Sequence, residues 1–431
     1  MRTRLAAGLA AACLTGVAHA RPECAGAWLP VPAAFQTTPF SGGVHALVSH
    51  NFDSLGPGLP TVFAGGQFST VGGLSIPYVA RWDGTSWHAL GTGVDNIVRA
   101  LTMFDPDGDG PAAAQLIAGG DFTHAGGRDV GFVAAWDGVA WSDLGGGFDA
   151  PVQALCVLDL DGPGPQPAAL YAGGSFRQSA ASPTRAIARW DGTAWQEVGG
   201  GLSGGGGIFD ATACNVLAAH DPDGVGPAPE QLVVGGTFAN AGGVTAGSIA
   251  TWDGQQWTAL GSGVFVEEPY AAVYAAASSG DPVLPRLVIG GFFTHAGGVE
   301  ALGVASWDGA SWSALPGLML PVTAVAYLDD DASAFTPALL FAGGPTEATG
   351  GADGIARHRH GAWEPLASGV NGSVYSLRAH DPDGAGPAGI ELLVGGIFTQ
   401  AGGLPVNNLA RWGCDRPTLR EIRFFGARPR P

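Results

Sequence analysis

A tryptophan phrase recurs along the chain at nearly constant spacing, and this repeat restricts the possible folds more than any other feature. The phrase is typified by "YVARWDGTSW". Successive copies begin 54, 54, 62, 55, 51 and 54 residues apart when the degenerate sixth copy is included. Its first position is held by Trp82, Trp136, Trp190, Trp252, Trp307, His358 and Trp412. A period of this length indicates an array of similar supersecondary units.

Each repeat contains four short apolar segments, which in the second copy read "IVRALTMF", "QLIAGGDFT", "GFVAAWDG" and "WSDLGGG". The segments have the length and composition of strands and are separated by Gly, Asp and Pro. The Asp-Gly pair after the first tryptophan is typical of a hairpin turn. Each repeat is therefore predicted to be an antiparallel meander. Such a sheet is apolar on both faces, so the repeats must stack, as the blades of a β-propeller do.

The last copy of the phrase, "NLARWGCD", lacks the second tryptophan that follows five positions after the first in the other copies. The N-terminal stretch "CAGAWLPV" supplies a replacement in Trp28. The sequence thus predicts an all-β, seven-bladed β-propeller of four-stranded antiparallel blades, in which the N-terminal strand completes the last blade. Cys24 and Cys414 would meet at the joined turn. A disulfide between them is expected to stabilise the ring by about 4 to 5 kcal/mol in the chain-entropy model.

The domain organisation follows from the two ends of the repeat. Residues 1–20 carry an arginine-containing start, an apolar run and "AHA", which is the pattern of a secretory signal peptide. Residues 21–415 are assigned to the propeller and 416–431 to a flexible C-terminal tail. No later apolar run has the length of a membrane span. We therefore expect a protein without a transmembrane segment that is secreted, extracellular or in the cell envelope.

Composition limits the possible partners. Glycine accounts for 72 of 431 residues while 46% of the chain is hydrophobic, so the chain is packed and uses glycine in turns. A net charge of −18 argues against nucleic acid or an anionic membrane as partner. We expect a monomer that binds a protein, a peptide or a glycan. Cys156 and Cys214, on innermost strands, are expected to be buried free thiols that point to the same side of their blades and do not face each other.

The order of apolar strand, Gly-Gly, Phe and later Trp resembles the kelch-type propellers. The longer phrase "GGxFTxAGG" followed by "ARWDGxxWxxLGxG" is similar to the propeller of fungal cortical polarity-marker proteins and to uncharacterised secreted bacterial repeat proteins. The resemblance implies the fold and leaves function open, because such propellers are recognition platforms, structural modules and sometimes enzymes. The residues of the copper site of kelch-like oxidases cannot be assembled from this sequence. No catalytic residue is carried over, and no cofactor is expected to be required.

Acidic loops between the first and second strands are candidate calcium sites. Alternate carboxylates at Asp105, Asp107 and Asp109 resemble the start of a calcium-binding loop. The alternative is that Asp and Gly close a hairpin. The absence of a distal glutamate in register favours the hairpin.

Carboxylates just before the first strands of blades two to five form a second candidate site. These are Asp95, Asp149, Asp210, Glu267 and Glu268. If the first strands line the axis, these side chains would form an acidic arc at the mouth of the channel that attracts a cation, an amine or a basic peptide. The alternative is that they are solvated turn residues. The tryptophans recur at fixed strand positions, which favours core packing over carbohydrate stacking.

These features favour a non-catalytic binding or structural module that acts through its top-face loops. No nucleophile elbow, zinc motif or nucleotide loop is present. The alternative is a carbohydrate-active enzyme, a hydrolase or lyase, that uses carboxylates around the axis. Two opposed carboxylates about 5 to 10 Å apart would favour it.

Overall fold

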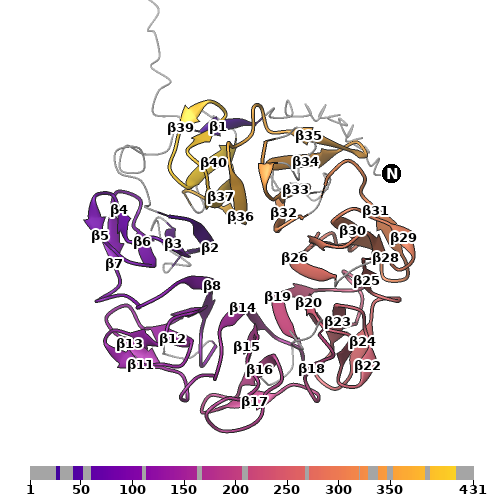
Figure 1. The fold of residues 1–431 in the computed structure, drawn as a ribbon, viewed down its shortest axis with the longest axis horizontal. Helices are drawn as coiled ribbons and strands as arrows, with labels where there is room; N and C mark the ends of the chain where they lie inside the picture. Colours follow the sequence, from indigo (N-terminus) through magenta and orange to yellow (C-terminus); the bar gives the residue numbers. More distant parts are fainter. Residues whose placement is uncertain are drawn as a thin grey trace, which may run out of the picture.

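A computed structural model describes residues 26–29, 42–51, 60–108, 113–162, 167–205, 212–266, 271–319, 321–328, 338–346, 353–383 and 389–413. These residues form seven four-stranded antiparallel sheets, arranged as blades around a central opening (Figure 1). In six blades the strands follow chain order from the axis outward, as the meander prediction requires, and in the seventh the outermost strand is the N-terminal β1. The predicted propeller is confirmed. No helix in the described ranges is long and apolar enough to cross a membrane.

Equivalent strands recur in every blade, which we number one to seven from β2 onward. The innermost strands are β2 (Val44–His50), β8 (Val98–Phe104), β14 (Val152–Leu158), β19 (Ala213–His220), β26 (Ala272–Ser278), β32 (Ala324–Leu328) and β36 (Ser373–His380). The second strands are β3 (Thr61–Gly66), β9 (Gln115–Gly120), β15 (Ala169–Gly174), β20 (Gln231–Thr237), β27 (Leu287–Phe292), β33 (Leu339–Gly343) and β37 (Glu391–Ile397). The third strands are β6 (Val79–Trp82), β12 (Val133–Trp136), β16 (Ile187–Trp190), β23 (Ile249–Trp252), β30 (Val304–Trp307), β34 (Ile355–Arg359) and β40 (Leu409–Gly413). The outermost strands are β7 (Trp87–Ala89), β13 (Trp141–Asp143), β17 (Trp195–Glu197), β24 (Trp257–Ala259), β31 (Trp312–Ala314), β35 (Ala362–Pro365) and β1 (Ala27–Leu29).

Two-residue strands add small hairpins, mostly between the second and third strands of a blade. They are β4 (Thr70–Val71), β5 (Leu74–Ser75), β10 (His124–Ala125), β11 (Arg128–Asp129), β18 (Leu202–Ser203), β21 (Asn240–Ala241), β22 (Val244–Thr245), β25 (Val264–Phe265), β28 (His295–Ala296), β29 (Val299–Glu300), β38 (Gln400–Ala401) and β39 (Leu404–Pro405). We refer to the segment between the second and third strands as the b–c hairpin of its blade.

The N-terminal strand closes the ring. β1 pairs with β40 so that Trp28 lies opposite Trp412, the same register that joins Trp82 to Trp87 in the first blade. Figure 1 shows β1, in the colour of the N-terminus, within the C-terminal blade. Trp28 is therefore the missing tryptophan of the repeat. The signal peptide, the tail, Cys24 and Cys414 lie outside the described residues, and the disulfide stays a prediction.

The glycine doublet of each second strand has two separate packing roles. The first glycine faces the next blade: a Cβ on Gly119 would lie 2.5 Å from Cγ1 of Val152, and the pattern holds from Gly65 and Val98 to Gly395 and Val44. The second glycine of six doublets lies against a backbone carbonyl at, or directly before, the first residue of the innermost strand of its own blade. Small residues are thus required for both blade contact and backbone approach.

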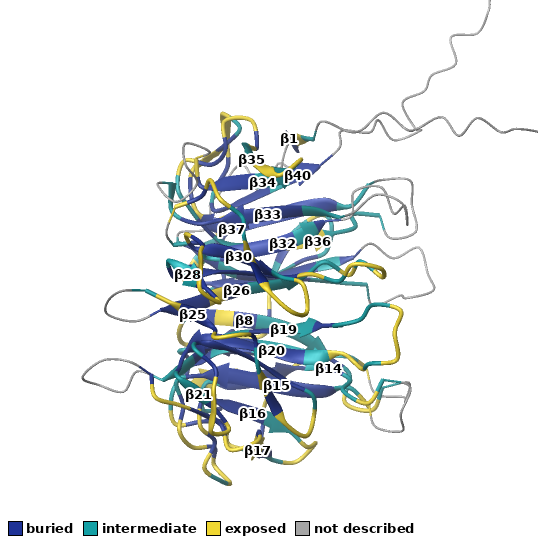
Figure 2. Ribbon diagram, turned by 90° about the vertical axis from the view of Figure 1, so that its right-hand side faces the viewer, coloured by how far each residue is buried: buried dark blue, intermediate teal, exposed yellow. Residues whose placement is uncertain are grey.

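The second tryptophan of a blade joins it to the blade before it. Nε1 of Trp141 donates a hydrogen bond to the carbonyl of Leu90 at 2.8 Å, and Trp195 donates likewise to Leu144 at 3.0 Å. Trp28 repeats the contact with Leu366 at 2.9 Å. These three side chains are buried. Figure 2 shows in dark blue that most of the strand residues are buried. Core packing is therefore the role of these tryptophans, as the sequence predicted.

Cys156 and Cys214 are free thiols, as predicted, but the prediction that they point to the same side of their blades was wrong. Both contribute to one apolar cluster between blades three and four, with Cys214 buried and Cys156 half-buried. A β-bulge after Cys214 shifts the alternation of β19 by one residue. Cys214 therefore packs against Gly173 of blade three, while Cys156 is paired with Tyr171 within that blade.

Candidate binding site at the channel mouth

A β-bulge near the start of the innermost strands displaces one residue per blade from the ladder. The register shifts at this point in six innermost strands. In blade six the equivalent residue, Thr323, lies directly before β32. A bulged residue has no cross-strand partner, so its side chain is free to take a direction outside the regular alternation. We call these seven residues the mouth ring: His45, Arg99, Gln153, Asn215, Tyr274, Thr323 and Tyr375.

The residue type at the mouth ring differs from blade to blade, whereas the residues on either side of it are nearly the same in every blade. The residue before it is valine in six blades and cysteine in one, and it packs on the glycine of the neighbouring blade. The residues after it are mostly alanine and leucine. Since every blade folds in the same way, the fold does not require different side chains at the bulge. All seven are polar or aromatic, and they include both donors and acceptors.

His45 and Tyr375 form an aromatic pair across the junction of blades one and seven. Their rings are stacked, with centroids 4.9 Å apart and an interplanar angle of 3°. Nε2 of His45 is buried and has no hydrogen-bond partner among the described residues. Burial, followed by the nearby charge of Arg99, lowers the pKa of His45, so the ring is neutral at pH 7. A buried ring nitrogen without a partner is costly in the unliganded protein.

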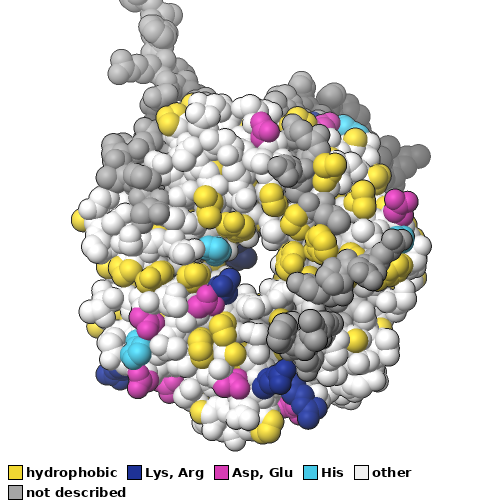
Figure 3. Space-filling model, viewed as in Figure 1, with side chains coloured by type: hydrophobic (Ala, Val, Ile, Leu, Met, Phe, Trp, Pro, Cys, Tyr) yellow, Lys and Arg dark blue, Asp and Glu magenta, His cyan; other side chains and the backbone are white. Residues whose placement is uncertain are grey.

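Other members of the mouth ring are held in fixed positions. Arg99 forms a two-pronged ion pair with Asp121, with Nε and Nη2 at 2.6 and 2.7 Å from the two carboxylate oxygens. Thr323 donates to the carbonyl of Val374 at 2.6 Å. Figure 3 shows hydrophobic side chains around the central opening and charged groups of both signs on one side of it. The mouth therefore presents ordered polar groups beside apolar surface.

Two carboxylates of the predicted acidic arc accept hydrogen bonds from the b–c hairpins of their own blades. Oδ1 of Asp95 accepts from the backbone amides of Thr123 and His124 at 2.9 and 3.0 Å. Partial burial opposes ionisation of Asp95, but the hydrogen bonds from His124 and Thr123 outweigh it and lower the pKa. Oδ1 of Asp149 accepts from two consecutive amides in the same way. In blade seven Asn371 fills this position with the same two bonds.

An amide can therefore replace the carboxylate, which indicates a structural role for the two described members of the arc. Asp210, Glu267 and Glu268 lie outside the described residues. Binding of a cationic ligand by the arc stays a prediction.

In the described part of the candidate calcium loop, Asp105 and Asp107 make the contact of a hairpin turn. Oδ1 of Asp105 accepts from the backbone amide of Asp107 at 3.2 Å, and Asp159 and Asp161 repeat the contact at 3.1 Å. Asp109 lies outside the described residues. No group of three or more potential metal ligands occurs in the described ranges. Calcium binding by Asp105, Asp107 and Asp109 stays a prediction that a calorimetric titration tests.

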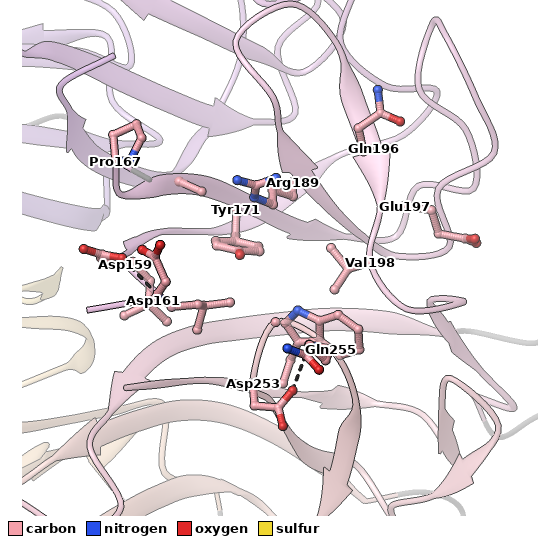
Figure 4. Close-up of a pocket in the computed structure, with 15 residues that line it drawn as sticks. Asp159, Asp161, Pro167, Tyr171, Arg189, Gln196, Glu197, Val198, Asp253 and Gln255 are labelled. Carbon is pink, nitrogen blue, oxygen red and sulfur yellow. Dashed lines mark hydrogen bonds between the residues drawn. The ribbon is translucent and has the colours of Figure 1, made fainter. Parts of the chain in front are cut away.

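A second concavity of about 390 Å³ lies between blades three and four (Figure 4). Two of its carboxylates are turn residues: Oδ1 of Asp159 accepts from the amide of Asp161, and Oδ1 of Asp253 accepts from the amide of Gln255 at 2.8 Å. In Figure 4, Glu197 points away from both. Asp159 and Asp253 thus serve as acceptors within their own turns.

The ring of blades and the channel mouth together define the class of protein: this chain is a β-propeller. No protein-family model matches it, and no curated protein matches it. Among solved structures, Sqt1 of Saccharomyces cerevisiae is similar with a TM-score of 0.50 at 14% identity, over 88% of this chain and 97% of that one. An ancestral GH74 enzyme matches with a TM-score of 0.49 at 10% identity, over 85% of this chain and 45% of that one. These likenesses concern the fold alone.

Sequence reasoning singled out the acidic residues and missed the mouth ring. The signal was present as the variable position in the segments "VHALV", "VRALT", "VQALC" and "VYSLR". It was not recognised because a bulge cannot be distinguished from an alternating strand without knowing which residues pair.

Proposed function

We propose that this chain is a non-catalytic binding module that holds its ligand at the mouth ring. The observation that supports this most is the variation of one position per blade on an otherwise repeated scaffold, together with the unpartnered Nε2 of His45. A ligand hydrogen bond to that nitrogen would remove the cost of leaving it unsatisfied.

The chemistry of the mouth ring suits a glycan or a peptide. Gln153 and Asn215 are planar amides that can both donate and accept, and Tyr274 offers an aromatic face. Convergent polar groups beside aromatic surface are common features of small-ligand sites. The proposal includes secretion to the cell exterior or envelope and a kelch-type relationship, in line with the signal sequence and the glycine doublets.

The test is a binding and turnover screen of the purified mature protein against glycans and peptides. Each ligand found is then measured with Tyr375→Ala and His45→Ala. We expect these variants to lose about tenfold or more in affinity, since hydrogen bonds and stacking contacts are removed together. His88→Ala is the matched control, because His88 lies on the outermost strand β7 and pairs with Asp83 at 2.6 Å.

Unchanged affinity in both mouth variants would contradict the proposal. Turnover of a glycan by the wild-type protein would instead support the carbohydrate-active enzyme.

A further inference from the structure

Arg378 is a charged side chain on the innermost strand of blade seven, in the interior of β36 rather than at its end. Its side chain is exposed, and Figure 1 shows that β36 is the strand of its blade that borders the central opening. Arg378 follows Tyr375 of the mouth ring by three residues, which corresponds to about 10 Å along a strand. Arg378 thus lies further along the same strand as Tyr375, whose ring stacks on His45 of blade one.

The charge of Arg378 is not compensated by the described residues. Arg99, the other arginine on the described innermost strands, is neutralised by Asp121. Glu391, on the adjacent strand β37, is already paired with Arg411, whose Nε and Nη2 donate to its two carboxylate oxygens at 2.7 Å each. No hydrogen bond or ion pair joins Arg378 to any described residue. Surrounding atoms lower its pKa by desolvation, and no described carboxylate offsets this.

The equivalent positions on the other innermost strands carry no charge. They are Val48, Thr102, Cys156, Ala218, Ala277 and Ala326. None of these uncharged side chains can serve as a counter-ion for Arg378. β36 therefore carries a guanidinium without a described counter-ion at a position where the other innermost strands are uncharged, in a chain whose net charge is −18.

We propose that the channel binds a small ligand bearing an oxyanion, a carboxylate or a phosphate, which pairs with Arg378 while the rest of the ligand contacts the mouth ring. A guanidinium matches these groups through two parallel hydrogen bonds, and such charge-assisted bonds are stronger where water is partly excluded. The inference deepens the proposed function and rests on it for the contacts at the mouth. The oxyanion contact itself depends only on Arg378 and not on the mouth ring.

The experiment compares acidic and neutral sugars by calorimetry on the full mature protein. Glucuronate and glucose 6-phosphate supply the two oxyanions, glucose is the neutral counterpart and inorganic phosphate is the isolated anion. We expect Arg378→Gln to lower the affinity for the two acidic sugars about tenfold or more. Glucose is expected to be unaffected. Arg128→Gln removes the same charge from the exposed b–c hairpin of blade two and is expected to change nothing.

The outcomes distinguish the oxyanion contact at Arg378 from the contacts at the mouth ring. Equal affinity of wild type and Arg378→Gln for all four probes would overturn the oxyanion site, even if mouth variants still weaken glucose binding. Loss of acidic-sugar binding in Arg378→Gln but not in Tyr375→Ala would support the oxyanion site and contradict the mouth ring.

Arg378→Lys keeps the charge but not the paired donors, and an intermediate affinity is expected. Thermal unfolding confirms that each variant is folded, and failure of phosphate to raise the wild-type melting temperature would also count against the site.

Discussion

At the scale of single residues, the polar side chains of this protein divide into those that bind their own backbone and those that do not. Asp149 accepts hydrogen bonds from the amides of Arg177 and Gln178, and Asp95 and Asn371 do the same in their blades. The carboxylates that looked like ligands in the sequence thus hold hairpins in place. His45 and Arg378 have no such partner among the described residues, and they are the better candidates for ligand contact.

Substitution of Asp149 separates the structural role from a binding role. Asp149→Ala is expected to lower the free energy of unfolding by about 1 to 2 kcal/mol, because two backbone amides lose their acceptor. Asp149→Asn should change it little, since Asn371 makes the same bonds in blade seven. Urea denaturation measures both. A large loss in Asp149→Asn would mean that the charge itself is needed.

Two histidines, the buried His220 and the half-buried His380, make stability depend on pH. Burial, followed by the charge of Arg411, lowers the pKa of His380 to about 4, and burial also lowers the pKa of His220. Each is hydrogen-bonded to a serine of the next blade, His380 to Ser49 and His220 to Ser278. In the unfolded chain a histidine titrates near 6.5. The unfolded state therefore binds more protons between about pH 4 and 6.5.

The free energy of unfolding is accordingly expected to be highest above about pH 6.5 and to fall towards pH 4, with up to about 3 kcal/mol from His380. Urea denaturation at pH 7.5, 6 and 5 measures this loss. His380→Gln, which keeps a hydrogen-bonding group near Ser49, should lose less stability over the same range. Parallel pH profiles for variant and wild type would show that His380 does not contribute.

At the scale of the strand, the repeated residues are those that touch the next blade. The first glycine of each doublet accommodates a valine or cysteine of the following innermost strand, and the second tryptophan donates to a carbonyl of the preceding blade. The degenerate sixth copy keeps the same sheet, with His358 opposite Trp363 and ring centroids 5.0 Å apart. A histidine therefore replaces the first tryptophan without loss of the blade.

Contact between blades two and three can be tested with a pair of substitutions. Gly119→Ala places a methyl group 2.5 Å from Cγ1 of Val152 and is expected to cost about 1 to 3 kcal/mol. Val152→Ala removes the opposing methyl groups and should cost less in the Gly119→Ala background than in the wild type. Urea denaturation of the four proteins gives the coupling energy. Strict additivity would show that the two positions do not touch in solution.

At the scale of the whole molecule, stability depends on closure of the ring. The seventh blade takes three strands from the C-terminal end and β1 from the N-terminal end, joined by the pairing of Trp28 with Trp412. Opening this junction would separate the two ends of a closed array of blades. A covalent link at the junction would restrict the unfolded chain as well.

The disulfide prediction is tested by counting thiols. If residues 1–20 are removed as the predicted signal peptide, four cysteines remain, of which Cys156 and Cys214 are free. Denatured, unreduced protein is therefore expected to show two reactive thiols, and reduction should reveal two more and lower the melting temperature. Cys24→Ser should remove the effect of reductant on stability. Four reactive thiols without reduction would rule out the Cys24–Cys414 bond.

The sequence by itself determined the propeller, the number of blades and the place of closure, because these follow from strand length, turn residues and the spacing of Trp82 to Trp412. It also predicted that the tryptophans pack in the core. The use of Asp95 and Asp149 as hairpin acceptors, the side of the blade that Cys214 faces and the membership of the mouth ring were decided only by tertiary structure. The physical reason is that a bulge changes the direction of a side chain, and a hydrogen-bond partner about 28 residues away is set by three-dimensional proximity rather than by local pattern.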